Sequence, residues 1–381
     1  MSEAVHYPER RVIGLMSGTS LDGMDRVLVR FFPVDGPAPG WELLDHATRP
    51  WPEDLRARLE RTAEGEAIPA AEYAALHFEV AECFAEFVLD GRYENPSPDL
   101  AAFPGQTLHH APDRGYGLQV GNASVFATLT GIPTIGDFRS PDLALGGQGA
   151  PLVPLADALL RRHPGQFRAI VNLGGIANLT LLPPGEGIEG VRAWDTGPGN
   201  LLMDRVARLL LDVPFDRDGQ AAARGRVDGK HLAAWLEHPY FALSPPKSTG
   251  RETFGRAFLD DASLRRLAGE IGSESLLATL LELTCESLAR DLEESGCEVI
   301  YLAGGGARNL RLRSRLSERL PSMRVEDIET LSCPGQAREA LDFAFLAYLA
   351  SLGRPVSMSR VTGARVDAFA GSLSPVQPFQ E

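Results

Sequence analysis

The sequence predicts a two-lobed α/β protein with a duplicated fold and a central cleft between the lobes. A short strand, a turn of small residues and a second strand occupy residues 12–32, and the same pattern returns at residues 169–182. Apolar segments with helical spacing separate the predicted strands in both halves, as in α/β folds. The chain has 381 residues, which is more than the roughly 250–300 that one hydrophobic core usually supports.

Composition is that of a soluble globular protein, with 44% apolar and 23% charged residues. The net charge of −14 argues against a nucleic-acid surface but not against ATP, because backbone donors and a metal often build phosphate sites. The first eleven residues carry charges where a signal peptide needs an apolar core, and no apolar run approaches the ~20 residues of a membrane helix. We therefore expect a cytoplasmic protein with no membrane partner.

The four cysteines are far apart in the sequence and form no Cys-x-x-Cys pair. They are Cys83, Cys285, Cys297 and Cys333. Wide spacing of this kind favours reduced thiols over a disulfide framework or a zinc site.

In the first half, strands and helices are expected to alternate. Strands at 12–15 and 27–32 are followed by helices at 52–64 and 70–89. The later expected elements are a strand at 100–103, a strand and turn at 118–122, a helix at 123–130 and a strand at 132–137. The Gly/Pro-rich segment 145–151 suggests a lobe boundary, which gives an N-terminal lobe of 1–150 and a C-terminal lobe of 151–363. The tail, 364–381, is expected to pack on the N-terminal lobe.

The second half repeats the pattern of strands, glycine turns and helices. Strands are expected at 169–173, 179–182, 191–195 and 299–303, and helices at 201–211, 219–236, 276–295 and 337–352. Residues 304–309 form a glycine-rich turn that opens a further helix. Two copies of strand, glycine turn and strand in one chain indicate duplication.

Glycine-rich turns follow the strands that end near residues 15, 173, 195 and 303. Ligands of α/β sheets bind at the carboxyl ends of strands, and glycine lets the backbone approach phosphate while turn N–H groups and hydroxyls donate to it. Acidic residues in the first turn then need a divalent cation between them and phosphate. One such turn alone is equally well explained as an ordinary hairpin, but together the turns favour a nucleotide site. Two hairpins would hold the polyphosphate and residues 304–309 would pack on the base.

Asp195 is the best candidate for a general base. It ends a predicted strand directly before Thr-Gly-Pro-Gly-Asn, so a rigid turn would hold its carboxylate in place for deprotonating water or a hydroxyl during phosphoryl transfer. The alternative is an Asx-turn or an N-cap for the helix at 201–211. Asn200 can serve as that N-cap instead, which would free Asp195.

Three further polar groups have two interpretations each. Asp137 and Arg139 end a strand, so Arg139 either binds an anion bidentately or pairs with Asp137. Glu339 either accepts hydrogen bonds from sugar hydroxyls or is an exposed first-turn residue favoured by the helix dipole. The basic loop at 247–252 either closes over phosphate or is plain surface.

Other motifs give weaker evidence for a functional site. Residues 216–219, Asp-Arg-Asp-Gly, lack the later Glu of a calcium loop, so a solvated turn is favoured. His109 and His110 have no metal-ligand partner at i+4 and are interpreted as polar loop residues. The sequence contains neither a P-loop nor a dinucleotide fingerprint.

In order along the chain, the motifs resemble those of the anhydro-N-acetylmuramic acid kinase family from about residue 11 onward. The matching segments are 14–25 (GLMSGTSLDGMD), 105–107 (GQT), 118–122 (LQVGN), 136–139 (GDFR), 146–154 (GGQGAPLVP), 172–178 (NLGGIAN), 195–200 (DTGPGN), 246–252 (PKSTGRE), 304–309 (GGGARN), 339–344 (EALDFA) and 361–364 (VTGA).

The resemblance implies the ribonuclease H-like fold of the actin, sugar kinase and heat-shock ATPase superfamily. It implies ATP and Mg²⁺ as cofactors, with Asp22 or Asp25 as possible metal ligands. The implied nucleotide-binding residues are Ser17, Gly18, Thr19, Ser20, Leu21, Asp22, Gly23, Met24, Asp25, Gly174, Gly175, Asn178, Gly197, Gly199, Asn200, Gly304, Gly305, Gly306 and Asn309. The implied sugar-binding residues are Gln106, Asn122, Asp137, Arg139 and Glu339.

The reaction implied by the resemblance has two parts in one step. Water opens the 1,6-anhydro ring of 1,6-anhydro-N-acetylmuramic acid at the anomeric carbon, with Asp195 as its base, and O6 takes the γ-phosphoryl group. The product is N-acetylmuramic acid 6-phosphate, made during peptidoglycan recycling. Ring strain helps the bond break, and a carboxylate with a pKa near ~4 is ionised at neutral pH.

The sequence departs from the family pattern at two places. Pro104 stands where the family usually has His, and Ser140 and Pro141 follow Arg139 where more arginine is usual. Arg139 would then contact any anionic group alone, so the departures bear on recognition of the lactyl carboxylate and on substrate affinity more than on the class of reaction.

Two other functions compete with this prediction. One is a kinase of the same fold that acts on another hexose or amino sugar. The other is a non-catalytic, ATP-gated scaffold, for which Asp195→Asn would change nothing. A homodimer is expected because it is common among such kinases.

Overall fold

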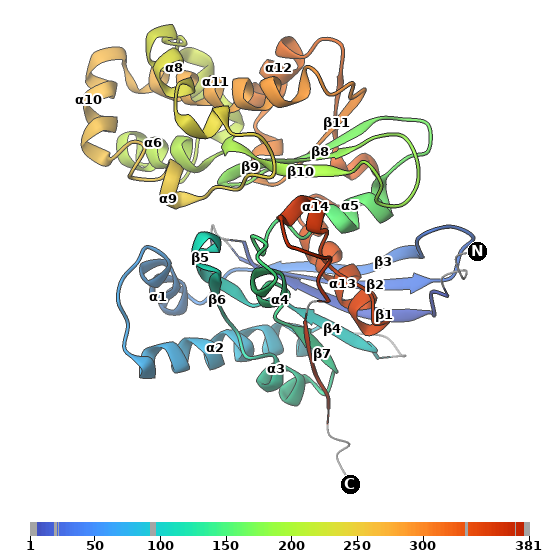
Figure 1. The fold of residues 1–381 in the computed structure, drawn as a ribbon. Helices are drawn as coiled ribbons and strands as arrows, with labels where there is room; N and C mark the ends of the chain where they lie inside the picture. The colour runs from blue at the N-terminus through green and yellow to red at the C-terminus, as the bar shows by residue number, and fades with distance from the viewer. Residues whose placement is uncertain are drawn as a thin grey trace. The chain divides into compact units, whose positions relative to one another are not determined.

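The computed structural model describes residues 6–18, 21, 23–91, 97–331, 334–369 and 371–376. The chain divides into two compact units. Unit 1 comprises Met1–Arg161 and Gln336–Glu381, and unit 2 comprises Arg162–Gly335. Each unit contains one main sheet with helices packed on it (Figure 1).

Unit 1 has a six-stranded sheet in the order β13-β7-β4-β1-β2-β3. β1, β2 and β3 are antiparallel neighbours, whereas β4 is parallel to β1 and β7 is parallel to β4. The strands are β1 (Arg10–Met16), β2 (Met24–Phe32), β3 (Gly40–Arg49), β4 (Leu100–Phe103), β7 (Thr134–Gly136) and β13 (Ser372–Ser374). β13 adds antiparallel to β7 at the edge.

Unit 2 has a five-stranded sheet in the order β10-β9-β8-β11-β12. The strands are β8 (Arg168–Leu173), β9 (Ile176–Leu182), β10 (Arg192–Pro198), β11 (Val299–Ala303) and β12 (Arg324–Asp327). The first three are antiparallel neighbours and the last two run parallel to β8. Counted within each unit, both sheets share the strand order 3-2-1-4-5, and β13 adds a sixth strand at the edge of the sheet in unit 1. This shared order is that of the ribonuclease H-like fold and confirms the predicted duplication.

Helices cover both faces of the sheet in unit 1. Ile13 and Leu15 of β1 point into a core formed with helices α1 (Glu53–Ala63), α2 (Ala70–Leu89) and α3 (Ala123–Thr130). On the opposite face, α13 (Arg338–Ser351) packs on β1, β2 and β4. Gly14 makes this packing possible, because a Cβ on Gly14 would lie 1.9 Å from the Ala340 carbonyl oxygen. Figure 1 shows α2 and α3 on one side of this sheet and α13 on the other.

The division into units differs from the predicted lobes. The first unit extends to Arg161 and regains the chain at Gln336, so α5 (Pro154–Arg161) and α13 belong to unit 1 and not to a lobe spanning 151–363. The physical reason is burial: α13 is an apolar helix that covers the sheet of unit 1, and α5 packs on α13. The Gly/Pro-rich segment 145–151 therefore lies within unit 1 and does not mark the boundary of that unit.

The core of unit 2 is centred on α11 (Ser273–Leu292), which packs against α6 (Leu201–Leu211), α7 (Gln220–Arg224), α8 (Gly229–Leu236), α10 (Asp261–Ile271) and α12 (Leu310–Arg319). The predicted single helix at 219–236 is wrong, since the structure splits it into α7 and α8. The break lies at Gly225, where an added Cβ would be 2.1 Å from the Glu274 carbonyl oxygen. Contact with α11 therefore decides where this helix ends.

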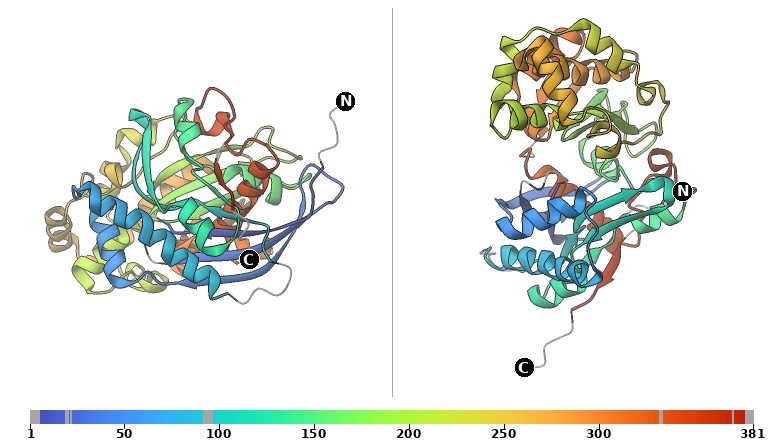
Figure 2. Two further views of the ribbon diagram at one scale, coloured as in Figure 1. Left: turned by 90° about the horizontal axis from the view of Figure 1, so that it is seen from below. Right: turned by 90° about the vertical axis from the view of Figure 1, so that its left-hand side faces the viewer.

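Several short elements complete the chain. They are the hairpin β5 (Gln106–Ala111) and β6 (Tyr116–Val120), α4 (Ser140–Ala144), α9 (Arg251–Phe254), α14 (Ser359–Thr362) and the 3₁₀ turns η1 (Pro112–Arg114), η2 (Arg217–Gly219), η3 (Pro239–Ala242), η4 (Gly305–Arg308) and η5 (Ile328–Leu331). Figure 2 shows the β5–β6 hairpin, in blue-green, from two further sides. The elements that the sequence did not predict include β3, β5, α5 and α10.

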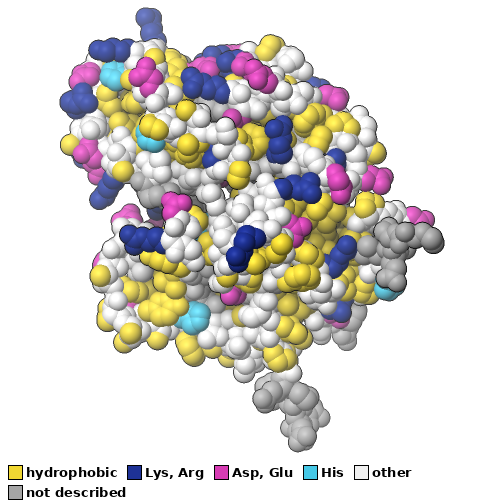
Figure 3. All heavy atoms as spheres, in the orientation of Figure 1, with side chains coloured by type: hydrophobic (Ala, Val, Ile, Leu, Met, Phe, Trp, Pro, Cys, Tyr) yellow, Lys and Arg dark blue, Asp and Glu magenta, His cyan; other side chains and the backbone are white. Residues whose placement is uncertain are grey.

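Surface charges and thiols are unremarkable in the described chain. Figure 3 shows basic and acidic side chains interspersed on the face that it draws. Exposed ion pairs in unit 2 include Arg266–Glu270 and Arg311–Glu318. Within the described residues, no helix is long and apolar enough to cross a membrane. Cys83, Cys285 and Cys297 are free thiols, and Cys333 lies outside the described residues.

Candidate active site

The β1–β2 turn of unit 1 is braced from inside. The buried Ser17 hydroxyl donates to the Gly23 carbonyl at 2.8 Å and accepts from the Trp51 indole N–H at 3.1 Å. The Leu21 N–H donates to the Gly18 carbonyl at 3.2 Å. Thr19, Ser20 and Asp22 lie outside the described residues. Ser17 therefore holds the shape of the turn through its side chain.

Leu21 and Met24 of this predicted nucleotide motif face inward, whereas Asp25 is partly exposed. Leu21 and Met24 are each 1% exposed and belong to the core of unit 1, which leaves only their backbones for a ligand. Leu21 also has a left-handed φ of 56°. Asp25 accepts a hydrogen bond from the Thr48 hydroxyl at 2.6 Å. Gly23 is tightly placed, with the Arg49 carbonyl oxygen 3.1 Å from the position of an added Cβ.

Gln106 connects this turn to the β5–β6 hairpin. It is fully buried, and its Nε2 donates to the Thr107 carbonyl at 3.2 Å and reaches the Gly18 carbonyl at 3.4 Å. Its Oε1 is buried and has no hydrogen-bond partner among the described residues. An unpaired buried acceptor costs free energy, so this atom is a good candidate to receive a ligand hydrogen bond.

Arg139 and Glu339 come together in unit 1 although they are 200 positions apart. The Arg139 guanidinium donates to the Gly149 carbonyl at 2.8 Å. Burial lowers the pKa of Arg139, and the nearby charge of Glu339 opposes that shift. The Glu339 carboxylate of α13 is thus near enough to act electrostatically on a desolvated guanidinium. That either group contacts a sugar stays a prediction.

Asp137 has a different partner. Its Oδ1 accepts from the Ser140 hydroxyl at 2.5 Å and from the Ser140 N–H at 3.3 Å, at the start of α4. The alternative of an Asp137–Arg139 pair is therefore not what the structure describes. Ser140 and Pro141, the departures from the family pattern, form the first turn of α4.

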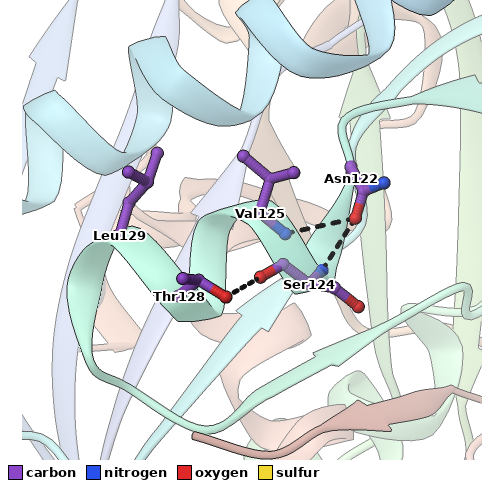
Figure 4. Close-up of a pocket in the computed structure, with 5 residues that line it drawn as sticks. All are labelled: Asn122, Ser124, Val125, Thr128 and Leu129. Atoms are coloured by element: carbon purple, nitrogen blue, oxygen red, sulfur yellow. Dashed lines mark hydrogen bonds between the residues drawn. The ribbon is translucent and has the colours of Figure 1, made fainter. Parts of the chain in front are cut away.

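Asn122 serves as the N-cap of α3. Its Oδ1 accepts from the Ser124 and Val125 N–H groups at 2.9 and 3.2 Å. Together with Thr128 and Leu129, these residues line an open surface pocket (Figure 4). With its carboxamide oxygen engaged by the helix, Asn122 has a structural role, which the prediction of a sugar contact did not anticipate.

Asp195 lies in β10 at a β-bulge between Asp195 and Gly197. Its Oδ2 accepts from the Thr249 N–H at 2.9 Å, and its own carbonyl accepts from the Tyr240 hydroxyl at 2.7 Å. Its N–H donates to the Lys247 carbonyl at 3.2 Å. Three contacts from residues 240–249 therefore hold backbone and carboxylate together, which is the fixed placement that a general base needs.

Asn200 does not cap α6 with its side chain, contrary to the prediction. Its Nδ2 donates to the Leu173 carbonyl at 2.9 Å, and no side-chain cap is formed. Instead, the N–H groups of Asn200 and Leu201 donate to the carbonyls of Gly174 and Gly175. The turn after β8 thus closes the start of α6, and Asp195 is not needed there.

The glycine turns of unit 2 meet at the carboxyl edge of its sheet. An added Cβ on Gly199 would lie 2.3 Å from the Gly174 carbonyl oxygen, and one on Gly306 would lie 2.7 Å from the Leu173 Cβ. Gly304 has a φ of 79°, and its Cβ would approach Asn172 Oδ1 at 2.7 Å. Three turns that are distant in sequence therefore pack closely together, and a side chain at any of these three glycines would clash with its neighbours.

Four other predicted nucleotide residues have defined positions. Asn178 pairs with Asp195 across β9 and β10. Asn309 Oδ1 accepts from the Leu312 N–H and caps α12. Gly197 faces Phe241, and Gly305 has no atom within 4 Å of its added Cβ, so its turn is open to a ligand.

For two polar residues, Lys247 and His110, the structure differs from an interpretation that the sequence analysis gave. Lys247 is buried and its ammonium lies 5.1 Å from the Tyr240 ring centroid, so the interpretation of this residue as plain surface is wrong. His110 lies in strand β5 and not in a loop. Burial, together with the charges of Arg139 and His109, lowers the pKa of His110 to about 4. Lys247 lies in the motif 246–252, and His110 lies three residues after the motif 105–107.

Two motif predictions concern metals. Asp216 accepts from the Ala221 and Ala222 N–H groups and so caps α7. In the part of the chain that the structure describes, no three His, Cys, Asp or Glu side chains gather as a metal cluster. Mg²⁺ in phosphoryl-transfer sites usually uses one or two carboxylates plus phosphate and water oxygens, so Asp22 or Asp25 as ligand stays a prediction.

Comparison with known proteins decides the family. The model of the anhydro-N-acetylmuramic acid kinase family matches residues 10–376. The chain belongs to this family. An anhydro-N-acetylmuramic acid kinase of Gloeobacter violaceus is 42% identical over 379 residues, covering 95% of this chain and 98% of that protein. Its counterpart from Cyanothece sp. is 40% identical over 377 residues, with 95% and 98% covered.

Solved structures are similar at a lower level. A glucokinase of Streptomyces griseus, solved with glucose and AMPPNP, has a TM-score of 0.42 and 11% identity, covering 88% of this chain and 99% of that one. This similarity adds nothing to the assignment. Membership of a kinase family makes the chain a phosphotransferase and implies ATP as the phosphoryl donor.

Proposed function

We propose that this kinase acts on 1,6-anhydro-N-acetylmuramic acid in peptidoglycan recycling, opening the anhydro ring with water while phosphorylating O6. The observation that supports it best is the fixed Asp195 carboxylate, which is held by the Thr249 N–H in a motif of the family. In this proposal Asp195 is the general base, and Arg139 and Glu339 contact the sugar.

The chemical step balances without a covalent enzyme intermediate. Asp195 takes a proton from water, the water oxygen bonds to the anomeric carbon C1, and the bond from C1 to O6 breaks. O6 then receives the γ-phosphoryl group, ADP leaves, and the proton passes from Asp195 to solvent. Positioning and charge neutralisation carry most of the catalysis of phosphoryl transfer.

The glycine turns fit a polyphosphate. The carbonyls of Gly174 and Gly175 are occupied by α6, and in a trans peptide the following N–H points the opposite way. The N–H groups of Gly175 and Ile176 are thereby turned away from α6, and phosphate oxygens are suitable acceptors for them. Mg²⁺ would neutralise charge on the phosphates.

A cytoplasmic homodimer completes the proposal, and light scattering of the purified protein tests its dimeric state.

Labelled water tests the reaction directly. The purified protein is incubated with ATP and 1,6-anhydro-N-acetylmuramic acid in H₂¹⁸O, and the product is analysed by mass spectrometry. Label at the anomeric oxygen supports hydrolytic ring opening, whereas phosphorylation of N-acetylglucosamine without the anhydro sugar contradicts the proposed substrate. Asp195→Asn should lower kcat by at least ~100-fold and retain ATP binding.

A matched variant controls for the amide substitution itself. Asp212→Asn changes the same side chain in unit 2, but at the C-cap of α6, where φ is 54°. Asparagine adopts this left-handed conformation readily, so kcat should stay within twofold of the wild-type value. Equal losses in both variants would remove the support for Asp195 as the base.

A further inference from the structure

Two polar side chains of the β5–β6 hairpin, His110 and Gln119, share one face. His110 is registered with Gly117, and Gln119 is registered with Thr107. An added Cβ on Gly117 would lie 3.5 Å from both Gln119 Nε2 and His110 Nδ1. The absent side chain of Gly117 thus leaves both polar groups on the same side of the hairpin.

Each of these side chains has one buried polar nitrogen without a partner among the described residues. They are His110 Nε2 and Gln119 Nε2. Buried polar groups are nearly always hydrogen-bonded in native proteins, and each exception calls for an explanation such as a ligand. Two adjacent exceptions on one hairpin point to a ligand that reaches both.

The chemistry of the two nitrogens is complementary. The His110 ring hydrogen-bonds the Gln148 backbone, and since Nε2 has no partner, that bond goes through Nδ1. Burial and the Arg139 charge lower the pKa of His110 to about 4, so the ring is uncharged at neutral pH and Nε2 carries a lone pair. His110 Nε2 is then an acceptor, and the Gln119 Nε2 amide is a donor.

We propose that His110 and Gln119 form a subsite for the acetamido group of the bound amino sugar. An acetamido group has one N–H donor, which suits His110 Nε2, and one carbonyl acceptor, which suits Gln119 Nε2. This inference rests on the proposed function, because it assumes an N-acetylated sugar in unit 1.

The substrate also carries a carboxylate, but this pair does not suit it. The lone pair on His110 Nε2 would repel an anion, and the uncharged imidazole ring offers it no ionic attraction. Arg139, whose charge acts on His110, is the cation of this region and remains the group for the carboxylate. The two substituents of the sugar are thereby assigned to two neighbouring but chemically distinct groups.

Sugar binding without ATP tests the subsite independently of turnover. Calorimetry compares 1,6-anhydro-N-acetylmuramic acid with its 2-deoxy analogue, in which hydrogen replaces the acetamido group. For the wild type we expect the analogue to bind about 100-fold more weakly, at roughly tenfold for each lost hydrogen bond. His110→Phe and Gln119→Met should each weaken binding of the acetylated sugar about tenfold and leave binding of the analogue within twofold.

His109→Phe is the matched control, because His109 is the exposed neighbour in β5 and stacks on Tyr116. It should leave the binding of both sugars unchanged. Equal weakening of both sugars by His110→Phe would show that His110 only supports the Gln148 segment, and unchanged binding of the acetylated sugar would also overturn the subsite. A wild type that binds both sugars as expected but does not phosphorylate them would refute the proposed function and leave the subsite standing.

Discussion

Replacing Arg338 with methionine tests the buried charge cluster that joins α5 to α13. Arg338 contacts Asp157 Oδ2 at 2.8 Å and Asp342 Oδ2 at 3.6 Å, and Arg161 contacts the same two carboxylates at 3.0 and 2.5 Å. All four side chains are at most 2% exposed. The chain leaves unit 1 after Arg161 and re-enters it at Gln336. The cluster therefore includes residues next to both of these points in the sequence.

The size of the effect follows from the charges left behind. Two buried carboxylates would share one guanidinium, and removing one partner of a buried ion pair typically costs about 3–5 kcal/mol. Burial raises the pKa of Asp342 to about 6, and losing Arg338 should raise that pKa further. We therefore expect the free energy of unfolding of Arg338→Met to fall by about 3–5 kcal/mol at pH 8.

The pH dependence has a defined sign. A carboxyl group with a raised pKa in the folded state keeps its proton where the unfolded chain has released it, so stability falls as pH rises between the two pKa values. The loss in Arg338→Met should be about 1–2 kcal/mol smaller at pH 6 than at pH 8, because each pKa unit corresponds to about 1.4 kcal/mol. Adding Asp342→Leu should restore much of the stability, since apolar replacement of buried pairs is often neutral.

Urea unfolding followed by hydrogen exchange on peptides of α13 measures the change in unit 1. Tryptophan fluorescence would mix the units, since Trp41 and Trp51 lie in unit 1 and Trp194 and Trp235 in unit 2. Arg266→Met, which breaks an exposed pair with Glu270, should cost under ~0.5 kcal/mol. A loss below ~1 kcal/mol for Arg338→Met at pH 8, or stability that rises with pH, would refute this reasoning.

Three further predictions concern packing, the first turn and a histidine. Gly14→Ala should destabilise unit 1 by about 1–3 kcal/mol or more, because the new Cβ meets the Ala340 carbonyl. Gly269→Ala, at an open position of α10, should instead stabilise the protein by up to ~1 kcal/mol, and thermal unfolding compares the two variants. Trp51→Phe removes the bond to Ser17 and should raise the KM for ATP severalfold, at about 1 kcal/mol per hydrogen bond, with unchanged KM counting against the bracing role. Since the pKa of His110 is lowered to about 4, the unfolded chain binds a proton that the folded one does not, so wild-type stability should fall as pH drops from about 6.5 towards 4. Urea titrations should find a weaker fall in His110→Phe, and an identical fall would contradict it.

Local patterns were sufficient for many elements. The helices 70–89, 123–130 and 201–211 and the strands 100–103 and 299–303 have the predicted bounds. Apolar spacing and flanking turns act over a few residues, so they can be recognised without tertiary structure. The motif around Asp195 was likewise visible, and the fold class follows from two similar hairpins.

Other features depended on contacts between distant residues. Gly225 ends α7 because α11 approaches it, and α13 joins unit 1 because its apolar face covers β1. Asn200 donates to Leu173, and Asp195 accepts from Thr249, a residue 54 positions away. Which hydrogen bond a polar side chain makes is decided by whichever partner folding brings within reach. The sequence by itself determined the family, the duplicated α/β fold and the candidate base, while tertiary structure decided the unit boundaries and what holds that base in place, because both depend on burial and on partners far away in the chain.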